Sequence, residues 1–398
     1  MSGPLDVRVC GPLVPFRDGF VEELGRSGYT PLSAANQVRL FAHVSRWMAS
    51  GGLDVEALCE AEAELFLADR RAEGYTSFHS LRALEPLLGF LRSVGAIPER
   101  VVVGPVGPVE ELVDGYRCWL VEERALTVST VERRVRTAWL FLGSTGVDVD
   151  VLEAGDVHRF VGRECPERSV GTAKLLVSDT RSFLRFLFAA GWTSVDLSTA
   201  VPGVAGWRGA ALPKAVASEM VAALLAGCDR TTVAGRRDYA VLVLLSRLGL
   251  RAGEVAGLCL EDIDWDAGEI TVTGKGVRVE RLPLPADVGE AIVGYLAHGR
   301  RPTTDRNVFL RLLAPHGPMT RGAVQGVVGQ ACERAGIERF GPHRLRHSAA
   351  TDMLGAGAAL AEVGQVLRHR SMSTTAIYAK CDLEALRSLA MVWPGGAR

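Results

Sequence analysis

The chain has 398 residues, of which 48% are hydrophobic and 23% charged, and its formal net charge is −1. This composition excludes an intrinsically disordered chain, and the length predicts two or three domains. No apolar run approaches the ~20 residues of a membrane span, so we expect no membrane segment. The first residues lack a basic region followed by an apolar one, and we therefore expect no signal peptide.

The cysteines and the distribution of charge add two weaker indications. Eight cysteines lie far apart with no C-x-x-C pair, which favours a reducing cytoplasm and predicts no metal site. Residues 199–398 contain 24 Lys+Arg against 19 Asp+Glu, so residues 1–198 contain the remaining 21 against 27. A basic C-terminal half fits a partner that carries phosphate groups.

The first half of the chain contains one sequence unit twice. Leu53–Leu58 (L-D-V-E-A-L) resembles Val147–Leu152 (V-D-V-D-V-L), and Phe90–Gly95 (F-L-R-S-V-G) resembles Phe186–Gly191 (F-L-F-A-A-G). A repeat of roughly 95 residues indicates a duplicated small domain and not a solenoid of short repeats.

Each copy has the hydrophobic periodicity of a four- or five-helix unit, and we predict two tandem helical domains, residues 1–100 and 105–195. In the second copy, Ser129–Glu132 has the form of a capping box, and Ser169 is placed to cap the last helix. Glycines and prolines between residues 196 and 215 predict a linker to the next domain.

Residues 216–398 have a mixed pattern. Glu269–Thr273 alternates with a period of two residues, and the runs Ile263–Trp265 and Val277–Leu282 lie on either side of it beyond short turns. This arrangement predicts a three-stranded antiparallel sheet among helices. The predicted fold class is therefore mainly α with a small antiparallel sheet in a C-terminal α+β domain, preceded by two helical bundles. The remaining patterns predict helices at about residues 218–226, 237–248, 253–259, 287–296, 321–335, 343–354, 360–367 and 373–378.

Two arginines lie in sequence contexts that suit a phosphate. His343 and Arg346 follow Pro342, which suits a first helical turn, and their spacing of three places them on one helix face. Arg251, in L-G-L-R-A-G-E, is expected at another helix start, with Glu254 one turn later. Backbone N–H groups at a helix start attract anions. Taken alone, the first motif also fits an ordinary arginine-rich helix end, and the second also fits a surface ion pair.

Three further side chains suit chemistry at a phosphate. Lys275 stands between Gly274 and Gly276 in the predicted hairpin turn, where a lysine can reach a ligand as a proton donor. Tyr378 is one of six tyrosines, and a phenol needs neighbouring cations and a base to act as a nucleophile. His369 precedes Tyr378 by nine residues and is placed to contact the same phosphate.

The order of these residues resembles the tyrosine recombinase (phage integrase) family. The resemblance spans about Lys214 to Leu389, and its strongest motifs are Leu248–Glu254, Thr273–Gly276, H-R-L-R-H at His343–His347, and Leu367–Tyr378, which ends S-T-T-A-I-Y. It implies a site-specific recombinase that breaks and rejoins DNA without a metal ion, another cofactor or ATP. Such an enzyme would serve integration, excision or transposition of a mobile element.

The resemblance also implies a role for each member of a catalytic set. Tyr378 would attack a DNA phosphorus, leaving a 3′-phosphotyrosine and a free 5′-hydroxyl, while Arg251 and Arg346 bind the non-bridging oxygens. Lys275 would protonate the leaving 5′-oxygen. The acid/base and the hydrogen-bond donor to the phosphate would be His343 and His369, respectively.

Double-stranded DNA is the partner that the resemblance implies, bound between the catalytic domain and the second helical domain. Residues 383–392 form an apolar stripe. The resemblance implies that this tail docks on a neighbour in a homotetramer, and packing on its own domain is the alternative. Members of the family usually have one helical domain before the catalytic domain, and the additional one here, residues 1–100, departs from that pattern. Accessory proteins are further candidate partners. The candidate contacts to the DNA backbone are Arg133, Arg134, Arg136, Lys174, Arg181 and Arg185.

Two other functions are compatible with the same motifs. A type IB topoisomerase would use the same groups to relax DNA without exchanging strands. A non-catalytic DNA-binding accessory protein would keep the fold, but the complete set of catalytic residue types argues against it.

Overall fold

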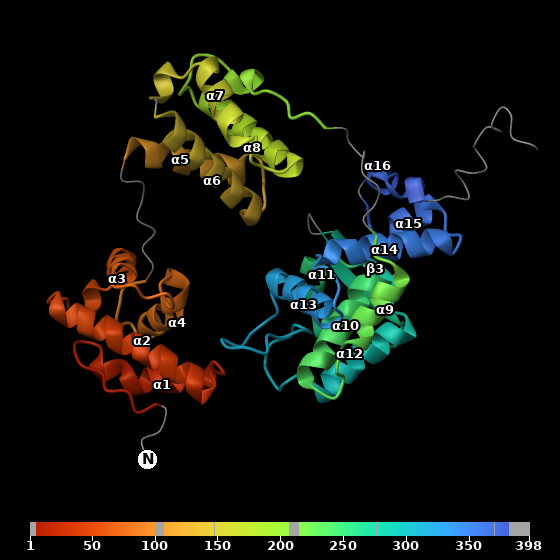
Figure 1. The fold of residues 1–398 in the computed structure, drawn as a ribbon, viewed down its shortest axis with the longest axis horizontal. Helices are drawn as coiled ribbons and strands as arrows, with labels where there is room; N and C mark the ends of the chain where they lie inside the picture. The colour runs from red at the N-terminus through yellow and green to blue at the C-terminus, as the bar shows by residue number, and fades with distance from the viewer. Residues whose placement is uncertain are drawn as a thin grey trace, which may run out of the picture. The chain divides into compact units, whose positions relative to one another are not determined.

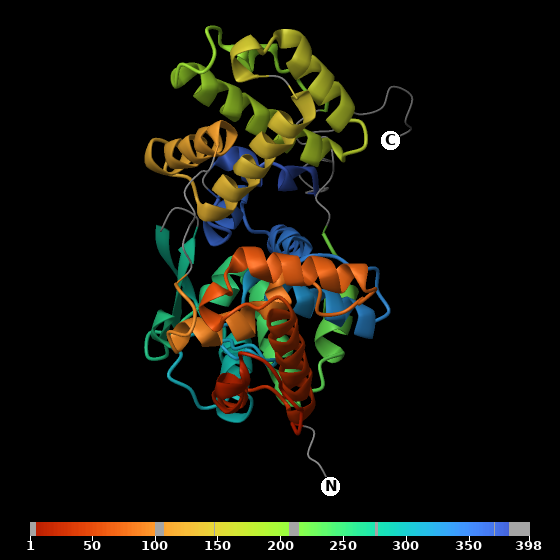
Figure 2. The same ribbon diagram turned by 90° about the vertical axis from the view of Figure 1, so that its left-hand side faces the viewer.

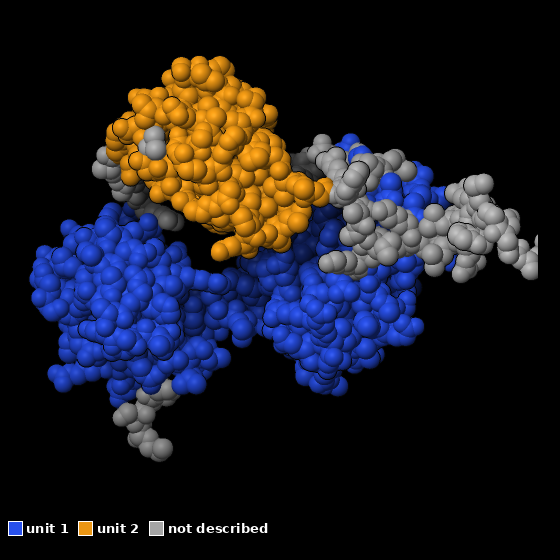
Figure 3. Space-filling view, turned by 45° about the horizontal axis from the view of Figure 1, so that its top comes forward, with its two compact units in different colours: residues 1–99, 211–398 blue, residues 100–210 orange. Residues whose placement is uncertain are grey.

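The computed structural model describes residues 5–99, 107–146, 148–206, 215–274, 278–369 and 371–381. The chain divides into two compact units, residues 1–99 together with 211–398, and residues 100–210 (Figure 3). Helices dominate the described residues, and one three-stranded antiparallel sheet accompanies them. The predicted fold class is thereby confirmed. Within the described ranges, no helix is long and apolar enough to cross a membrane.

The N-terminal segment is a helical bundle around one apolar core (Figure 1). Phe20, Phe41 and Phe90 come from three helices and meet in this core, with ring centroids 5.0 and 5.5 Å from that of Phe20. Pro31 begins the longest helix, and Thr30 caps it by accepting a backbone N–H of the first turn. The helices are α1 (Arg17–Arg26), α2 (Pro31–Ser50), α3 (Glu60–Ala72) and α4 (Leu81–Ser93), with 3-10 turns at Val14–Phe16 and Val55–Ala57.

The next segment also has four helices, with a 3-10 turn between the second and the third as in the first segment. Its helices are α5 (Pro108–Glu122), α6 (Val128–Thr145), α7 (Ala154–Glu164) and α8 (Val170–Ala189), with 3-10 turns at Val149–Val151 and Leu197–Ala200. Tyr116, Phe141, Phe160 and Phe183 lie in its core. The last 3-10 turn packs against α7 and α8 and buries Leu197. The beginning of the stretch predicted as a linker therefore belongs to this core.

One capping prediction in this segment is confirmed and another is wrong. Ser169 caps α8 by accepting a backbone N–H of its first turn. The capping box predicted at Ser129–Glu132 does not form, because α6 begins at Val128 and its N-cap residue is Thr127. The carbonyl of Thr127 accepts the first helical N–H groups, so the predicted cap lies inside the helix.

From residue 215 onward, the elements surround one apolar helix. They include α9 (Ser218–Ala226), α10 (Val233–Arg247), α11 (Ala252–Gly257), α12 (Ala286–His298), α13 (Arg321–Arg334), α14 (Pro342–Gly355), α15 (Leu360–Val366) and α16 (Met372–Thr375), with 3-10 turns at Leu260–Asp262 and Tyr378–Cys381. Residues 241–245 of α10 are all buried, so this part of the helix is apolar on every side. It packs against α9, α11, α12, α13 and α14 (Figure 1).

The sheet is an antiparallel meander next to α11. Its strands, in spatial order, are β1 (Ile263–Asp264), β2 (Glu269–Gly274) and β3 (Arg278–Pro283). β2 and β3 pair along their whole length, with Gly274 opposite Arg278 at the turn end (Figure 2). Alternate residues of β2, Ile270 and Val272, are buried in the same core as α10, as the period-two pattern predicts.

We expect Gly249→Ala to lower the free energy of unfolding by about 1–3 kcal/mol. Gly249 has φ +56°, and an added Cβ would lie 2.6 Å from Cδ2 of Leu367. The control is Gly253→Ala, because Gly253 lies in α11 and an added Cβ there has no neighbour within 4 Å. Urea unfolding measures both changes, and equal stability of the two variants would contradict the expectation.

Candidate active site

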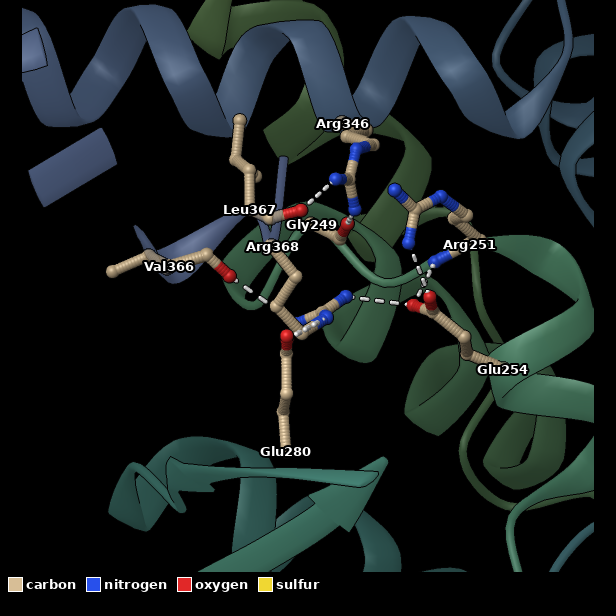
Figure 4. A network of polar contacts seen from close by, with 8 residues as sticks. All are labelled: Gly249, Arg251, Glu254, Glu280, Arg346, Val366, Leu367 and Arg368. Carbon is tan, nitrogen blue, oxygen red and sulfur yellow. Dashed lines mark hydrogen bonds and ion pairs between the residues drawn. The ribbon is translucent and has the colours of Figure 1, made fainter. Parts of the chain in front are cut away.

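The first two turns of helix α14 contain His343, Arg346 and His347. Pro342 occupies the first helical position, and Arg346 is 1% exposed. The guanidinium of Arg346 donates to the carbonyl oxygens of Gly249, at 2.5 Å, and Leu367 (Figure 4). Because Gly249 precedes α11 and Leu367 follows α15, Arg346 joins three segments that are far apart in the sequence.

Arg251 reaches the same network from the start of α11. The left-handed conformation of Gly249 turns the chain after α10, and Arg251 becomes the N-cap residue of α11. Glu254 accepts the backbone N–H of Arg251 at 2.8 Å and pairs with its guanidinium at 2.6 Å. The side chain of Arg251 remains 39% exposed, whereas that of Glu254 is 4% exposed. Arg251 is therefore the member of this pair that can also meet a ligand.

Tyr378 begins the 3-10 turn that follows α16. The helix predicted at residues 373–378 is shorter in the structure, because α16 ends at Thr375. Tyr378 is buried in a small apolar cluster with Val363 and Leu367. Its hydroxyl lies 2.9 Å from Nδ1 of His347 on α14, so the last described turn is held to the helix that carries Arg346.

Two imidazole rings contact this tyrosine, those of His347 and His369, and a third, that of His343, contacts His347. The ring centroids of His343 and His347 are 4.6 Å apart. The ring of His369 is nearly parallel to that of Tyr378, with centroids 6.1 Å apart, and its Nδ1 lies 2.8 Å from Oγ1 of the buried Thr375. The structure therefore brings together five members of the predicted catalytic set: Arg251, His343, Arg346, His369 and Tyr378.

Lys275, the sixth member of that set, lies outside the described residues. The strands on either side of it in the sequence adjoin the arginine network. A Cβ added to Gly274 of β2 would lie 3.8 Å from Oε1 of Glu254. Glu280 of β3 lies 3.8 Å from Nε of Arg368. The described part of the hairpin therefore lies beside Glu254, which pairs with Arg251, and beside Arg368.

Burial and the mutual repulsion of positive groups set the charges of this cluster. Burial and nearby Arg251 lower the pKa of Arg346 to about 10, which leaves the guanidinium charged at neutral pH. Burial, then His343 and Arg346, lower the pKa of His347 to about 4. Burial followed by Arg346 and Arg251 lowers the pKa of His369 to about 4. These two imidazoles are therefore neutral at pH 7, the state in which a ring nitrogen can accept a proton.

We expect the free energy of unfolding to fall as the pH decreases from about 6.5 to about 4. Below pH 6.5 the unfolded chain binds protons on His347 and His369, whereas the folded chain resists protonation until about pH 4. Protons therefore favour the unfolded state in this window. Urea unfolding of wild type and of the His347→Gln/His369→Gln variant measures the effect. The variant should depend less on pH, and an identical dependence would contradict the assignment.

The sequence interpretation missed three features of the cluster. It left His347 out of the catalytic set, although this residue ends the H-R-L-R-H motif. It also passed over Arg368, whose side chain is 4% exposed and pairs with Glu254, and Thr375, which is fully buried against His369. The only signal in the sequence was that these residues lie next to, or a few positions from, residues of the predicted set. Short irregular segments have no periodicity, so the sequence does not show which of their side chains point inward.

Two of the predicted DNA contacts have a role inside the second helical segment. Arg133 and Arg134 both pair with Asp179, whose side chain is 1% exposed. Arg134 also donates to Oγ of Ser182 at 2.8 Å. Since a buried carboxylate needs cationic partners, these arginines stabilise the bundle.

The other four predicted contacts differ in their freedom to reach DNA. Lys174 and Arg181 donate to backbone carbonyl oxygens of their own segment, each at 2.8 Å. Arg136 and Arg185 are exposed.

Among the residues that the structure describes, no group of three or more His, Cys, Asp or Glu side chains could hold a metal ion.

Comparison of sequences connects these features to known proteins. The sequence profile of the phage integrase family matches residues 214–384. Integrase/recombinase y4rA of Sinorhizobium fredii is 40% identical over 406 residues, which cover 100% of this chain and 98% of that protein. Tyrosine recombinase XerD of Mycobacterium tuberculosis is 34% identical over 307 residues, which cover 71% of this chain and 96% of that protein.

A solved structure has a similar fold. The Tn1549 transposon integrase, in complex with circular intermediate DNA, matches with a TM-score of 0.53 at 17% identity, covering 69% of this chain and 98% of that chain. At this identity the likeness concerns the fold alone. The sequence relatives decide the classification, because their identity extends over most or all of the chain. The chain belongs to the phage integrase family and is a tyrosine recombinase.

Proposed function

We propose that this chain is a site-specific recombinase that cleaves and rejoins double-stranded DNA through a covalent bond to Tyr378. The observation that carries the proposal is the convergence of Tyr378 with His347 and His369, packed on Leu367, whose carbonyl accepts a hydrogen bond from Arg346. A phenol beside neutral imidazoles and a fixed guanidinium has the groups needed to attack a phosphate. The names of the similar proteins, an integrase/recombinase and a transposon integrase with circular intermediate DNA, favour a mobile element as the substrate.

The proposed reaction is a transfer of one phosphodiester bond. The Tyr378 oxygen forms a bond to the scissile phosphorus, the bond from phosphorus to the 5′-oxygen breaks, and a 3′-phosphotyrosine remains. Arg251 and Arg346 bind the non-bridging oxygens, where negative charge grows in the transition state. Attack by the 5′-hydroxyl of another strand reverses these steps, so rejoining needs no ATP.

Two protons move in this reaction. His343 is the proposed base for the phenolic proton, and Lys275 donates a proton to the leaving 5′-oxygen, a step worth about 10²–10⁴-fold in rate. His369 hydrogen-bonds the phosphate. The hydroxyl of Tyr378 lies 2.9 Å from His347 and the residue is 1% exposed. Attack therefore requires Tyr378 to exchange this contact for the phosphate.

A nicked suicide duplex from the DNA that flanks the reading frame tests the proposal. Loss of the short fragment traps the intermediate, so we expect a covalent protein–DNA adduct on a denaturing gel and a new 5′-hydroxyl end. Two labelled duplexes should then give joined strands. Relaxation of supercoiled DNA without joined strands would assign a topoisomerase instead, and DNA binding without any adduct would assign an accessory protein.

We further propose that Arg136 and Arg185 contact the DNA backbone. Alanine at either position should weaken binding similarly for all DNA sequences and reduce the slope of log affinity against log salt by about one. Fluorescence anisotropy at several salt concentrations measures this slope. The control is Arg134→Ala, which should lower the free energy of unfolding because Asp179 loses a cationic partner. Unchanged slopes for both exposed arginines would contradict their assignment.

The apolar tail at residues 383–392 lies outside the described residues. We propose that it joins four copies on DNA in the cytoplasm, with accessory proteins as additional partners. Sedimentation of the DNA complex tests this, comparing the full chain with a chain that ends at residue 381. Tetramers formed equally well by the shortened chain would assign the contact to another surface.

A further inference from the structure

Arg368 combines two features that are unfavourable by themselves. Its backbone has φ +55°, a left-handed conformation that residues other than glycine rarely adopt. Its side chain is only 4% exposed, and a buried guanidinium is costly unless it is paired. Burial accordingly lowers the pKa of Arg368. A residue that persists under both conditions is held there by specific partners.

These partners are two carboxylates and a carbonyl (Figure 4). Nη2 of Arg368 lies 2.6 Å from Oε2 of Glu254, and its Nε lies 3.8 Å from Oε2 of Glu280 on β3. Nη1 donates to the carbonyl of Val366 at 3.2 Å. The side chain therefore connects the loop after α15 to α11 and to the sheet.

Glu254 is shared between two arginines. Its Oε1 lies 2.6 Å from Nη1 of Arg251, and its Oε2 also accepts the backbone N–H of Arg251. Burial alone would raise the pKa of Glu254, but this N–H and the charges of Arg368 and Arg251 outweigh it and lower the pKa. One buried carboxylate thus faces two guanidinium groups, of which Arg251 alone is substantially exposed.

We propose that Arg368 is a positioning residue that makes Arg251 available to the DNA phosphate. Arg368 balances the negative charge of Glu254. Glu254 can then orient Arg251 while the positive charge of Arg251 remains available to the phosphate. Without Arg368, Glu254 would pair with Arg251 alone and compete with the phosphate for the same guanidinium. The inference rests on the proposed function, in which Arg251 binds a non-bridging oxygen.

Single-turnover cleavage of the suicide duplex tests the proposal. Arg368→Met keeps a long side chain without its charge, and we expect cleavage to slow at least tenfold. Arg368→Gly removes the charge and also relieves the left-handed backbone, so it should show the same defect with a smaller loss of thermal stability than Arg368→Met. The matched control is Arg247→Met, because Arg247 forms an exposed ion pair with Asp287 and should cleave at the wild-type rate.

A modified substrate separates action through Arg251 from a general structural role. A methylphosphonate at the scissile position replaces one charged oxygen by a neutral methyl group, which removes the charge that Arg251 would bind. On this substrate the defects of Arg251→Ala and of both Arg368 variants should shrink together. A bridging 5′-sulfur makes a leaving group that needs no proton donor, and it should leave the Arg368 defect unchanged.

Three results would overturn the inference. The first is wild-type cleavage by both Arg368 variants. The second is a defect that methylphosphonate relieves for Arg251→Ala but not for the Arg368 variants. The third is relief of the Arg368 defect by the 5′-sulfur, which would assign action on the leaving group. If methylphosphonate fails to relieve Arg251→Ala itself, the phosphate-binding role of Arg251 in the proposed function fails, and the inference with it.

Discussion

Tyr378→Phe is expected to abolish the covalent protein–DNA adduct while DNA binding remains. The substitution removes the one oxygen that is proposed to attack the phosphorus. It also removes the contact of the hydroxyl with His347, which lies at 2.9 Å, at a cost of about 1 kcal/mol. The fold should therefore survive. Denaturing gels of the suicide reaction and anisotropy with the same duplex measure adduct and binding separately.

The matched control for this experiment is Tyr295→Phe. Tyr295 is also 1% exposed, and its hydroxyl accepts the backbone N–H of Leu310 at 3.3 Å, away from the histidine cluster. This variant should lose a similar amount of stability and form the adduct at the wild-type rate. An undiminished adduct with Tyr378→Phe would refute Tyr378 as the nucleophile.

Arg346→Lys should lose both cleavage and stability. A lysine keeps the positive charge but lacks the planar fork that bonds two carbonyl oxygens at once. Loss of one preorganised contact to a developing oxyanion costs about 10²–10³-fold in rate. The carbonyl oxygens of Gly249 and Leu367 also lose their buried donor, which should lower the free energy of unfolding by about 1–3 kcal/mol.

Arg300→Lys separates the two effects. The guanidinium of Arg300 also donates to backbone carbonyl oxygens, those of Asp305 and Asn307, but it takes no part in the cluster. Urea unfolding and single-turnover cleavage should show that Arg300→Lys loses stability and keeps its rate, whereas Arg346→Lys loses both. Wild-type cleavage by folded Arg346→Lys would contradict the role of Arg346.

The local parts of the site could be predicted from the amino-acid sequence. The spacing of His343 and Arg346 behind Pro342 predicts one helical face, and α14 has it. The period-two pattern of Glu269–Thr273 predicts a strand, and β2 has it. These predictions succeed because helix and strand periodicity depend on neighbours within a few residues, which a single sequence displays.

The pairing of groups that are distant in the sequence became visible only in the folded chain. Glu254 meets Arg368, and Arg346 meets the carbonyls of Gly249 and Leu367, across separations that no periodicity spans. The same holds for Asp179, which gives Arg133 a partner inside the bundle. These pairings are a consequence of burial. Once a charge leaves water it must find a counter-charge or a hydrogen bond, and the packing of the whole chain determines which groups are near enough to supply it.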